Sequence, residues 1–281
     1  MVKAPDEMSR KHEKEVEEDS VEDATRLSAR LIYEVIRRDG HDELNRPRHS
    51  LIWSGLAAGI LISFSVIGEA IFRAYLPDAK WIFLLENLGY SFGFLLVILG
   101  RMQLFTENTI TTVLPLMAQP CREYLWKVVR LWGIVLTANV VGAFVAAAFL
   151  IMSGAFQPEV LDAIRELSLH ATGMSPWQAF VKALPAGVLV AAIVWMLPTA
   201  PRQPFFIILT FTWLLAAGDF THIIAGAVEM AYLLLQGDLA LGQAVFGFFF
   251  PVLIGNVIGG TAVFTMITWG QVKAEVAPAS R

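Results

Sequence analysis

Two polar stretches decide the fold: LFTEN at residues 104–108 and DFTHI at residues 219–223, each inside a long apolar segment. Irregular backbone survives at membrane depth only where it lines a cavity or is buried by protein. An ionisable residue at that depth is by default a functional candidate. The two stretches therefore predict a transport pathway, with His222 as its first candidate residue.

The composition places the rest of the chain in a bilayer. Of the 281 residues, 56% are apolar and 11% are aromatic, and the mean hydropathy is +0.59. Charged residues are dense in the first fifty positions and sparse afterwards, so a soluble tail precedes a membrane domain. A net charge of -4 argues against nucleic acid as a partner. The lone Cys121 excludes a disulfide framework within the chain, and the start of the sequence lacks the pattern of a secretory signal peptide.

Hydropathy predicts six membrane spans, since a hydrocarbon core of about 30 Å requires about 20 apolar residues. The spans cover residues 51–72, 84–114, 129–152, 180–198, 205–235 and 244–268. The second and fifth are too long for one simple crossing, so each is expected to be a helix that breaks near mid-membrane and restarts. The predicted fold class is an all-α membrane protein. Its parts are a disordered tail (1–19), an amphipathic helix with a linker (20–50), the spans (51–270) and a second tail (271–281).

Basic residues predict the orientation, because cytoplasmic loops carry an excess of Lys and Arg. One side of the predicted topology holds Arg46, Arg48, Arg122, Lys127, Arg130, Arg202 and Lys273, whereas the other holds Arg73, Lys80 and Arg165. We therefore expect both termini in the cytoplasm and the loop over residues 153–175 outside.

Three short matches recur in the same order in both halves of the membrane domain. They pair residues 56–59 with 184–187, residues 105–106 with 220–221, and residues 139–142 with 256–259. Small-residue motifs also recur by chance in apolar chains, but the shared order favours a true repeat. With three spans per half, the second copy enters from the opposite side, which predicts an inverted repeat whose breaks meet near the midplane.

These residues resemble the formate/nitrite transporter family over about residues 54–269, and most closely its YfdC-like inner-membrane branch. The resemblance rests on LFT at 104–106 with Asn108-Thr109, on Phe220, His222-Ile223 and Ala225, and on PVLIGNVIGG at 251–260. It implies an aquaporin-like protomer in a bacterial inner membrane, a homopentamer, and passage of small monovalent anions or their neutral acids. The sequence itself shows no cluster of metal ligands, so neither a metal nor a cofactor is expected.

The resemblance also assigns residues to the pathway. His222 corresponds to the central pore histidine and Thr106 to the hydroxyl residue that approaches it, although both could instead satisfy backbone groups freed by the breaks. An imidazole at mid-pore could supply or stabilise a proton for a weak acid. The complete set of predicted pathway residues is His222, Thr106, Glu107, Asn108, Tyr90, Phe94, Leu215, Phe220 and Thr221. Of these, Tyr90, Phe94 and Leu215 are constriction positions by resemblance alone.

Four positions depart from the family pattern. The expected outer-loop Lys and the Asn of the fourth span are replaced by Ala171 and Gly187. Thr221 stands where an acidic residue often precedes the histidine, and Glu107 stands where a small residue is usual. Glu107 could pair with His222, repel an anion, or cap the restarting helix.

The amino-terminal tail contains one predicted helix. Ser20 and Asp23 form a possible capping box, the residues Ala24, Leu27, Leu31 and Val35 recur at helical spacing, and Gly40 is the expected stop. The helix could lie on the membrane, dock under the pore mouth, or bind a partner.

Three functions remain open from the sequence: a pore for small anions and weak acids, a channel for neutral solutes such as water or glycerol, and a non-transporting protein that recruits a partner through its tail. The sequence shows no nucleophile and base pair, no metal-ligand cluster and no phosphate-binding glycine loop, so an enzyme is not expected.

Overall fold

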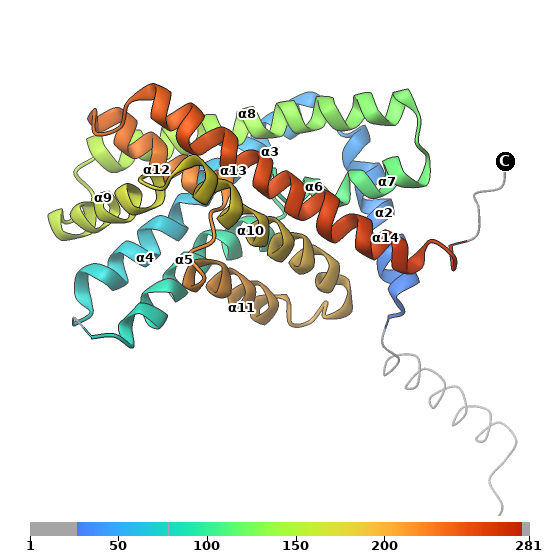
Figure 1. Ribbon diagram of the computed structural model, residues 1–281, viewed down its shortest axis with the longest axis horizontal. Helices are drawn as coiled ribbons and strands as arrows, with labels where there is room; N and C mark the ends of the chain where they lie inside the picture. Colours follow the sequence, from blue (N-terminus) through green and yellow to red (C-terminus); the bar gives the residue numbers. More distant parts are fainter. Residues whose placement is uncertain (1–26, 78, 277–281) are drawn as a thin grey trace, which may run out of the picture.

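A computed structural model describes residues 27–77 and 79–276 of the chain, and every regular element within these residues is a helix (Figure 1). The predictions for residues 1–19, Ser20, Asp23 and Ala24 lie outside the described residues.

The described residues contain six spans where hydropathy predicts them. Five helical segments are long and apolar enough to cross a membrane, and two shorter apolar helices, Pro204–Ala217 and Ile223–Gln236, together make the remaining span. In chain order the six spans are α3 with α4 (Arg48–Leu61, Ser63–Tyr75), α5 with α6 and α7 (Ile82–Leu99, Asn108–Thr111, Val113–Ala118), α8 (Arg122–Met152), α10 (Pro176–Met196) with a 3-10 turn (Leu197–Thr199), α11 with α12 (Pro204–Ala217, Ile223–Gln236), and a last span of two π-helical and two α-helical parts, η2, α13, η3 and α14 (Gln243–Phe249, Phe250–Val257, Ile258–Thr265, Met266–Val272). The second and fifth spans are interrupted at residues 100–107 and 218–222, as predicted.

One asparagine in each half holds the break of its own half in place. The Asn139 side chain accepts from the backbone N–H of Phe105 at 2.9 Å and donates to the carbonyls of Gly55 and Gln103, both at 2.8 Å. The break therefore has no unpaired backbone group at these positions, which burial in a membrane domain requires.

Asn256 repeats this arrangement in the second half. Its side chain accepts from the backbone N–H of Ile223 and donates to the carbonyls of Ala183 and Thr221, each at 2.9 Å. The two identical sets of bonds, one in each three-span half, show the predicted inverted repeat at atomic detail.

One sequence match was in the wrong register. The hydrogen bonds make Phe105 of the first half equivalent to Ile223 of the second half, rather than to Phe220. The backbone agrees, because Arg101 and Asp219 are the equivalent turn residues, with φ of 52° and 53°. The shared Phe-Thr pair at 105–106 and 220–221 is therefore a coincidence of composition and not the repeat.

The other two matches mark close helix contacts. A Cβ added to Gly59 would collide with the backbone carbonyl of Asn139, and a Cβ added to Gly187 would collide with that of Asn256. Small residues at these positions let the first span approach the third and the fourth approach the sixth, as is usual where helices pack inside a membrane.

Helix α2 (Ala29–Asn45) packs at the same end of the molecule as α14, under α7 and α10. Tyr33 of α2 contacts Trp269 of the last span, with ring centroids 5.3 Å apart. The long predicted loop contains a further helix, α9 (Pro158–Thr172), which packs on α4 and α12 at the other end (Figure 1). Both described ends of the chain therefore lie on the side opposite α9.

The prediction for the details of α2 was wrong in two respects. Gly40 lies inside the helix rather than at its end, and a Cβ there would collide with the carbonyl of Thr111. The predicted apolar stripe of Leu27, Leu31 and Val35 is exposed, whereas the buried face consists of Ile32, Tyr33, Ile36, Gly40 and Leu44. The helix begins after Ser28, whose hydroxyl accepts from the N–H of Leu31 at 3.3 Å.

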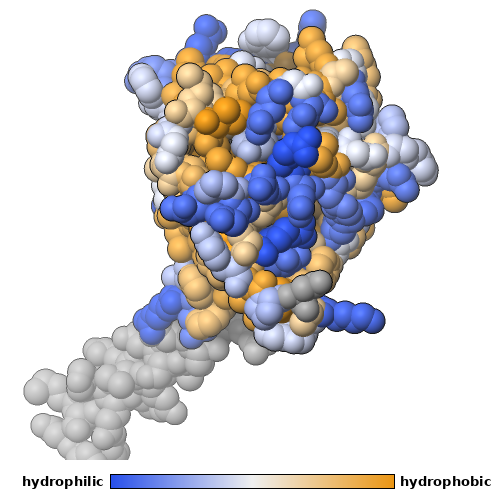
Figure 2. All heavy atoms as spheres, turned by 90° about the vertical axis from the view of Figure 1, so that its left-hand side faces the viewer, coloured by the Kyte–Doolittle hydropathy of each residue, from blue (hydrophilic) through white to orange (hydrophobic). Residues whose placement is uncertain are grey.

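The outside of the molecule is apolar around its spans. Large exposed side chains on the spans include Trp53, Trp126, Phe149, Phe206, Phe246 and Ile267. Figure 2, which faces the α9 end, shows hydrophilic residues gathered across the middle of this end and apolar residues around it. Such apolar faces are expected for spans that contact lipid or neighbouring subunits.

Candidate transport pathway

The two breaks meet at a contact between His222 and Thr106. Thr106 Oγ1 lies 2.7 Å from His222 Nε2, and both residues are buried. His222 is also the N-cap of α12, because its Nδ1 accepts from the backbone N–H of Ala225 at 3.3 Å. A ring nitrogen that accepts an N–H carries no proton, so the proton of the neutral imidazole is on Nε2 and points at Thr106. The hydroxyl hydrogen of Thr106 is then available to donate elsewhere.

Aromatic and aliphatic side chains enclose this contact. The ring of Phe94 lies 4.9 Å from that of His222 between centroids, and the ring of Tyr90 lies 5.5 Å from that of Phe94. Leu215, on α11, is fully buried in the same apolar cluster. Of the residues that the resemblance assigned to constrictions, Phe94 lies beside His222 and Tyr90 beside Phe94, where bulky apolar groups would exclude water and hydrated ions.

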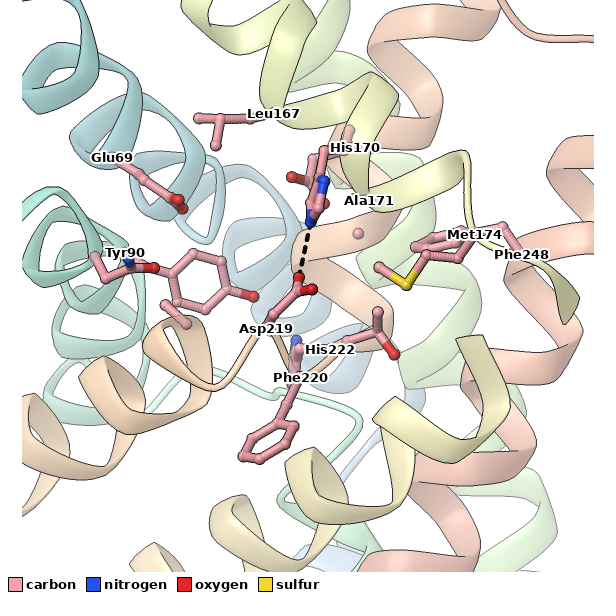
Figure 3. Close-up of a pocket in the computed structure, with 15 residues that line it drawn as sticks. Glu69, Tyr90, Leu167, His170, Ala171, Met174, Asp219, Phe220, His222 and Phe248 are labelled. Atoms are coloured by element: carbon pink, nitrogen blue, oxygen red, sulfur yellow. Dashed lines mark hydrogen bonds and ion pairs between the residues drawn. The ribbon is translucent and has the colours of Figure 1, made fainter. Parts of the chain in front are cut away.

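A cavity of about 70 Å³ begins at His222 and extends toward α9 (Figure 3); it is named the outer cavity for the α9 end of the molecule, which the sequence predicts to be outside. Phe220 and Thr221 both line it. The Thr221 hydroxyl donates to the carbonyl of Ala179 at 3.0 Å, so it binds neighbouring backbone rather than the cavity.

A second cavity of about 580 Å³ lies between the first break and α2; it is named the inner cavity for the α2 end of the molecule, which the sequence predicts to be cytoplasmic. Glu107 and Asn108 line it from the break, and Glu43 lines it from α2. The amide of Asn108 donates to the carbonyl of Leu104 at 3.2 Å and to Gln103 Oε1 at 3.1 Å, so it stabilises the turn of the break. The Thr106–His222 contact therefore joins a wall residue of the outer cavity to the break that lines the inner one.

Of the three alternatives for Glu107, capping of the restarting helix fits its position only in part. Glu107 is the N-cap residue of α6, but its side chain makes no capping hydrogen bond. Within residues 27–77 and 79–276, Glu107 Oε1 is buried and has no hydrogen-bond partner. Among the same residues no hydrogen bond or ion pair joins Glu107 to His222. The Glu107 side chain lines the inner cavity instead.

Ionisable residues at the outer cavity were missing from the predicted site. Asp219 binds Lys182 Nζ through Oδ2 and His170 Nε2 through Oδ1, the latter at 3.1 Å (Figure 3). Glu69 and Glu229 line the same cavity. The rule that directs attention to His222, that an ionisable residue inside a span is a functional candidate, applies equally to Glu69, Lys182 and Glu229 and would have found them.

An ion pair on α2 keeps the carboxylate of Glu34 charged. Arg37 donates two hydrogen bonds to the carboxylate of Glu34, both at 2.8 Å, and these bonds lower the pKa of Glu34 to about 2. Glu34 therefore stays charged and paired at physiological pH. In the described part of the chain, no group of three or more His, Cys, Asp or Glu side chains could hold a metal ion.

Comparison with known proteins gives consistent matches. The sequence pattern of the formate/nitrite transporter family matches residues 30–270. The inner membrane protein YfdC of Escherichia coli is 40% identical over 255 residues, which cover 91% of this chain and 82% of that protein. The formate channel FocA of Haemophilus influenzae is 25% identical over 240 residues, which cover 74% of this chain and 81% of that protein. A solved structure of a pentameric formate channel with formate bound has a TM-score of 0.70 at 22% identity, and the match covers 81% of this chain and 98% of that one.

Proposed function

Because this chain belongs to the formate/nitrite transporter family, we propose that it passes small monovalent anions or their neutral weak acids through a pathway centred on His222 and Thr106. The observation that supports this proposal is the contact of these two side chains at the meeting point of the two breaks, beside two cavities that open toward opposite ends. The inner membrane relative supports a multi-pass inner membrane protein.

The physical chemistry of a weak acid suits such a centre. An acid with a pKa near ~4 is about one part in a thousand neutral at pH 7, so the anion is the abundant species. Moving that anion past Phe94 costs several kcal/mol, whereas the neutral acid avoids most of this penalty. The free hydroxyl hydrogen of Thr106 would donate to an acid or anion oxygen between the two cavities, with its own oxygen held by His222.

The test is stopped-flow uptake into proteoliposomes, with formate, nitrite and acetate compared at about pH 5.5 and about pH 7.5. We expect saturable uptake that rises at the lower pH and that falls in His222→Ala. His49→Ala is the matched control, because His49 is exposed at the start of α3 and lines neither cavity. Uptake that is absent for all three solutes, or that is indifferent to His222→Ala, would reject the proposal.

A second candidate is a channel for neutral solutes such as glycerol. It is favoured by the carboxyl groups that line both cavities. It is also favoured by Ala171, which lines the outer cavity and stands in place of the outer-loop Lys of the family pattern. The same vesicles, loaded in an osmotic gradient of glycerol, separate the two functions. Glycerol flux without weak-acid flux would support the second candidate.

We also propose a homopentamer whose termini are cytoplasmic. The exposed apolar side chains on the spans, including Trp53 and Phe246, would be covered by lipid and neighbouring subunits, and the structural relative is described as pentameric. Native mass spectrometry from detergent would give the number of subunits directly.

A further inference from the structure

Two glutamates of the outer cavity have no role in the pathway described so far. Glu69 lies on α4 and Glu229 on α12, two helices that pack together, and both side chains line the cavity that begins at His222. Figure 3 shows Glu69 directed toward the space shared with Tyr90 and His222. Glu229 lies one helical turn beyond Gly226, with its Oε2 over that glycine.

Both carboxyl groups are unpaired, unlike the other acidic groups nearby. In the described part of the chain, neither forms a hydrogen bond or an ion pair, although the neighbouring Asp219 binds Lys182 and His170 and Glu86 binds Arg73 at 2.8 Å. Burying an unpaired charge in a membrane domain is costly, so two such groups beside one cavity of about 70 Å³ call for an explanation.

His222 is poorly suited to deliver a proton. Its Nδ1 accepts the N–H of Ala225 and its Nε2 is bonded to Thr106, so a second proton would have to displace the cap of α12. The resulting imidazolium would also be buried beside Phe94. A different group must then protonate an anion that enters from the α9 end.

We propose that Glu69 and Glu229 form a proton-donor pair that converts an entering weak-acid anion into its neutral acid in the outer cavity. The inference rests on the proposed function. The O–H bond of one carboxyl group breaks, its proton bonds to an oxygen of the anion, and the glutamate is left as a carboxylate. A hydronium ion from the bulk solvent at the α9 end then returns a proton to that carboxylate and is left as water. The neutral acid then passes to Thr106 and the inner cavity.

The surroundings favour a protonated carboxyl group in this cavity. Two unpaired carboxylates beside one small cavity repel each other, and protonation of one of them removes that repulsion. The charged and titratable groups that face the pair from the surrounding elements are Arg73 on α4, Glu86 and Tyr90 on α5, Glu166 and His170 on α9, Lys182 on α10, Asp219 in the break and His222 on α12. Of the cations, Arg73 forms an ion pair with Glu86 and Lys182 with Asp219. Neither forms an ion pair with one of the two glutamates.

The experiment measures formate uptake into proteoliposomes across a pH series for Glu69→Gln, Glu229→Gln and the double variant. A glutamine keeps the size of the side chain but carries no exchangeable acid proton. We expect uptake by the double variant to fall about tenfold or more at ~pH 7.5, because a positioned proton donor contributes ~10²–10⁴-fold. The difference should narrow toward ~pH 4.5, where formic acid itself is more abundant.

Two comparisons separate this role from a structural one. The double Glu→Asp variant keeps both acid groups and should retain most of the uptake. Glu159→Gln, on the exposed start of α9 and away from both cavities, should behave as wild type. If the double glutamine variant does not assemble, the pH profile of Glu229→Gln alone makes the same test.

Unchanged uptake at ~pH 7.5 in the glutamine variants would overturn the proton-donor role of the two glutamates. Increased uptake would overturn it as well, because it would mean that the carboxylates merely repel anions. A wild-type protein that passes no weak acid would instead overturn the proposed function, and the pair with it. The two failures are therefore distinguishable in one set of vesicles.

Discussion

The side chain of His222 works as a helix cap and as a partner of Thr106 at the same time. The cap fixes which ring nitrogen carries the proton, and that choice in turn fixes the direction of the hydrogen bond to Thr106 Oγ1. The orientation of a small substrate at the centre would therefore depend on a helix N-terminus. This coupling explains why a histidine can be kept at a buried position without carrying a charge there.

Removing the Thr106 hydroxyl should block the pathway without unfolding the protein. Thr106→Val preserves the shape but leaves His222 Nε2–H unpaired, at a cost of about 1–3 kcal/mol, and removes the hydroxyl donor. We expect weak-acid uptake to fall at least about tenfold, which corresponds to about 1.4 kcal/mol. The measurement is stopped-flow uptake at equal protein density.

Thr106→Ser is the matched control, since it keeps the hydroxyl and loses only a methyl group. It should retain most of the uptake. Equal uptake by the valine and serine variants would mean that the hydroxyl donates to nothing that matters for transport.

At the level of single residues, the sequence predicted part of this site. His222 and Thr106 stand inside apolar segments and are visible for that reason. Glu69 and Glu229 also stand inside spans, but only the fold shows that α4 and α12 bring them to one cavity. The contact of Lys182 with Asp219 joins residues far apart in the chain, and no spacing rule predicts it.

Among the secondary-structure elements, the two breaks are equivalent in their backbone and different in their side chains. Asn139 and Asn256 make the same three bonds, and Arg101 and Asp219 adopt the same left-handed turn. The sequence predicted both interruptions because each of the two apolar segments is too long for one crossing and contains a polar stretch. It could not give their register, since Phe and Thr are common in apolar helices and matched by composition.

Each asparagine should contribute several kcal/mol to the free energy of unfolding. Asn139→Ala and Asn256→Ala each remove three buried hydrogen bonds, and an unpaired buried backbone group costs about 1–3 kcal/mol. We expect both variants to lower the midpoint of thermal unfolding by about 5 °C or more. Tryptophan fluorescence of the purified protein in detergent measures the midpoint.

Asn45→Ala, at the exposed end of α2, serves as the control and should shift the midpoint little. The two buried variants should give similar shifts because the bonds are the same in both halves. A large shift for one and none for the other would contradict the equivalence of the two breaks.

For the whole molecule, the inverted repeat gives two cavities of unequal character. The inner cavity is lined by Glu107 and by acidic residues of α2, and the outer one by Glu69, Glu229 and the paired Asp219. A free anion would meet carboxyl groups at both ends, which favours passage of a protonated or neutral species. The six-span architecture was predictable from hydropathy, whereas α9 was not, because a helix of 15 residues with several charged side chains is too short and too polar to register as a span.

The orientation of the molecule can be tested with its own cysteine. Cys121 is exposed between α7 and α8, at the end where Lys127 of α8 donates to Asn45 of α2 at 3.3 Å. If the excess of basic residues places this end in the cytoplasm, a membrane-impermeant maleimide added to intact cells should leave Cys121 unlabelled until the membrane is opened. In a Cys121→Ser background, Ser153→Cys, exposed at the α9 end, should be labelled in intact cells. The reverse pattern would invert the topology, and the proton-donor pair of the α9 end would then face the cytoplasm.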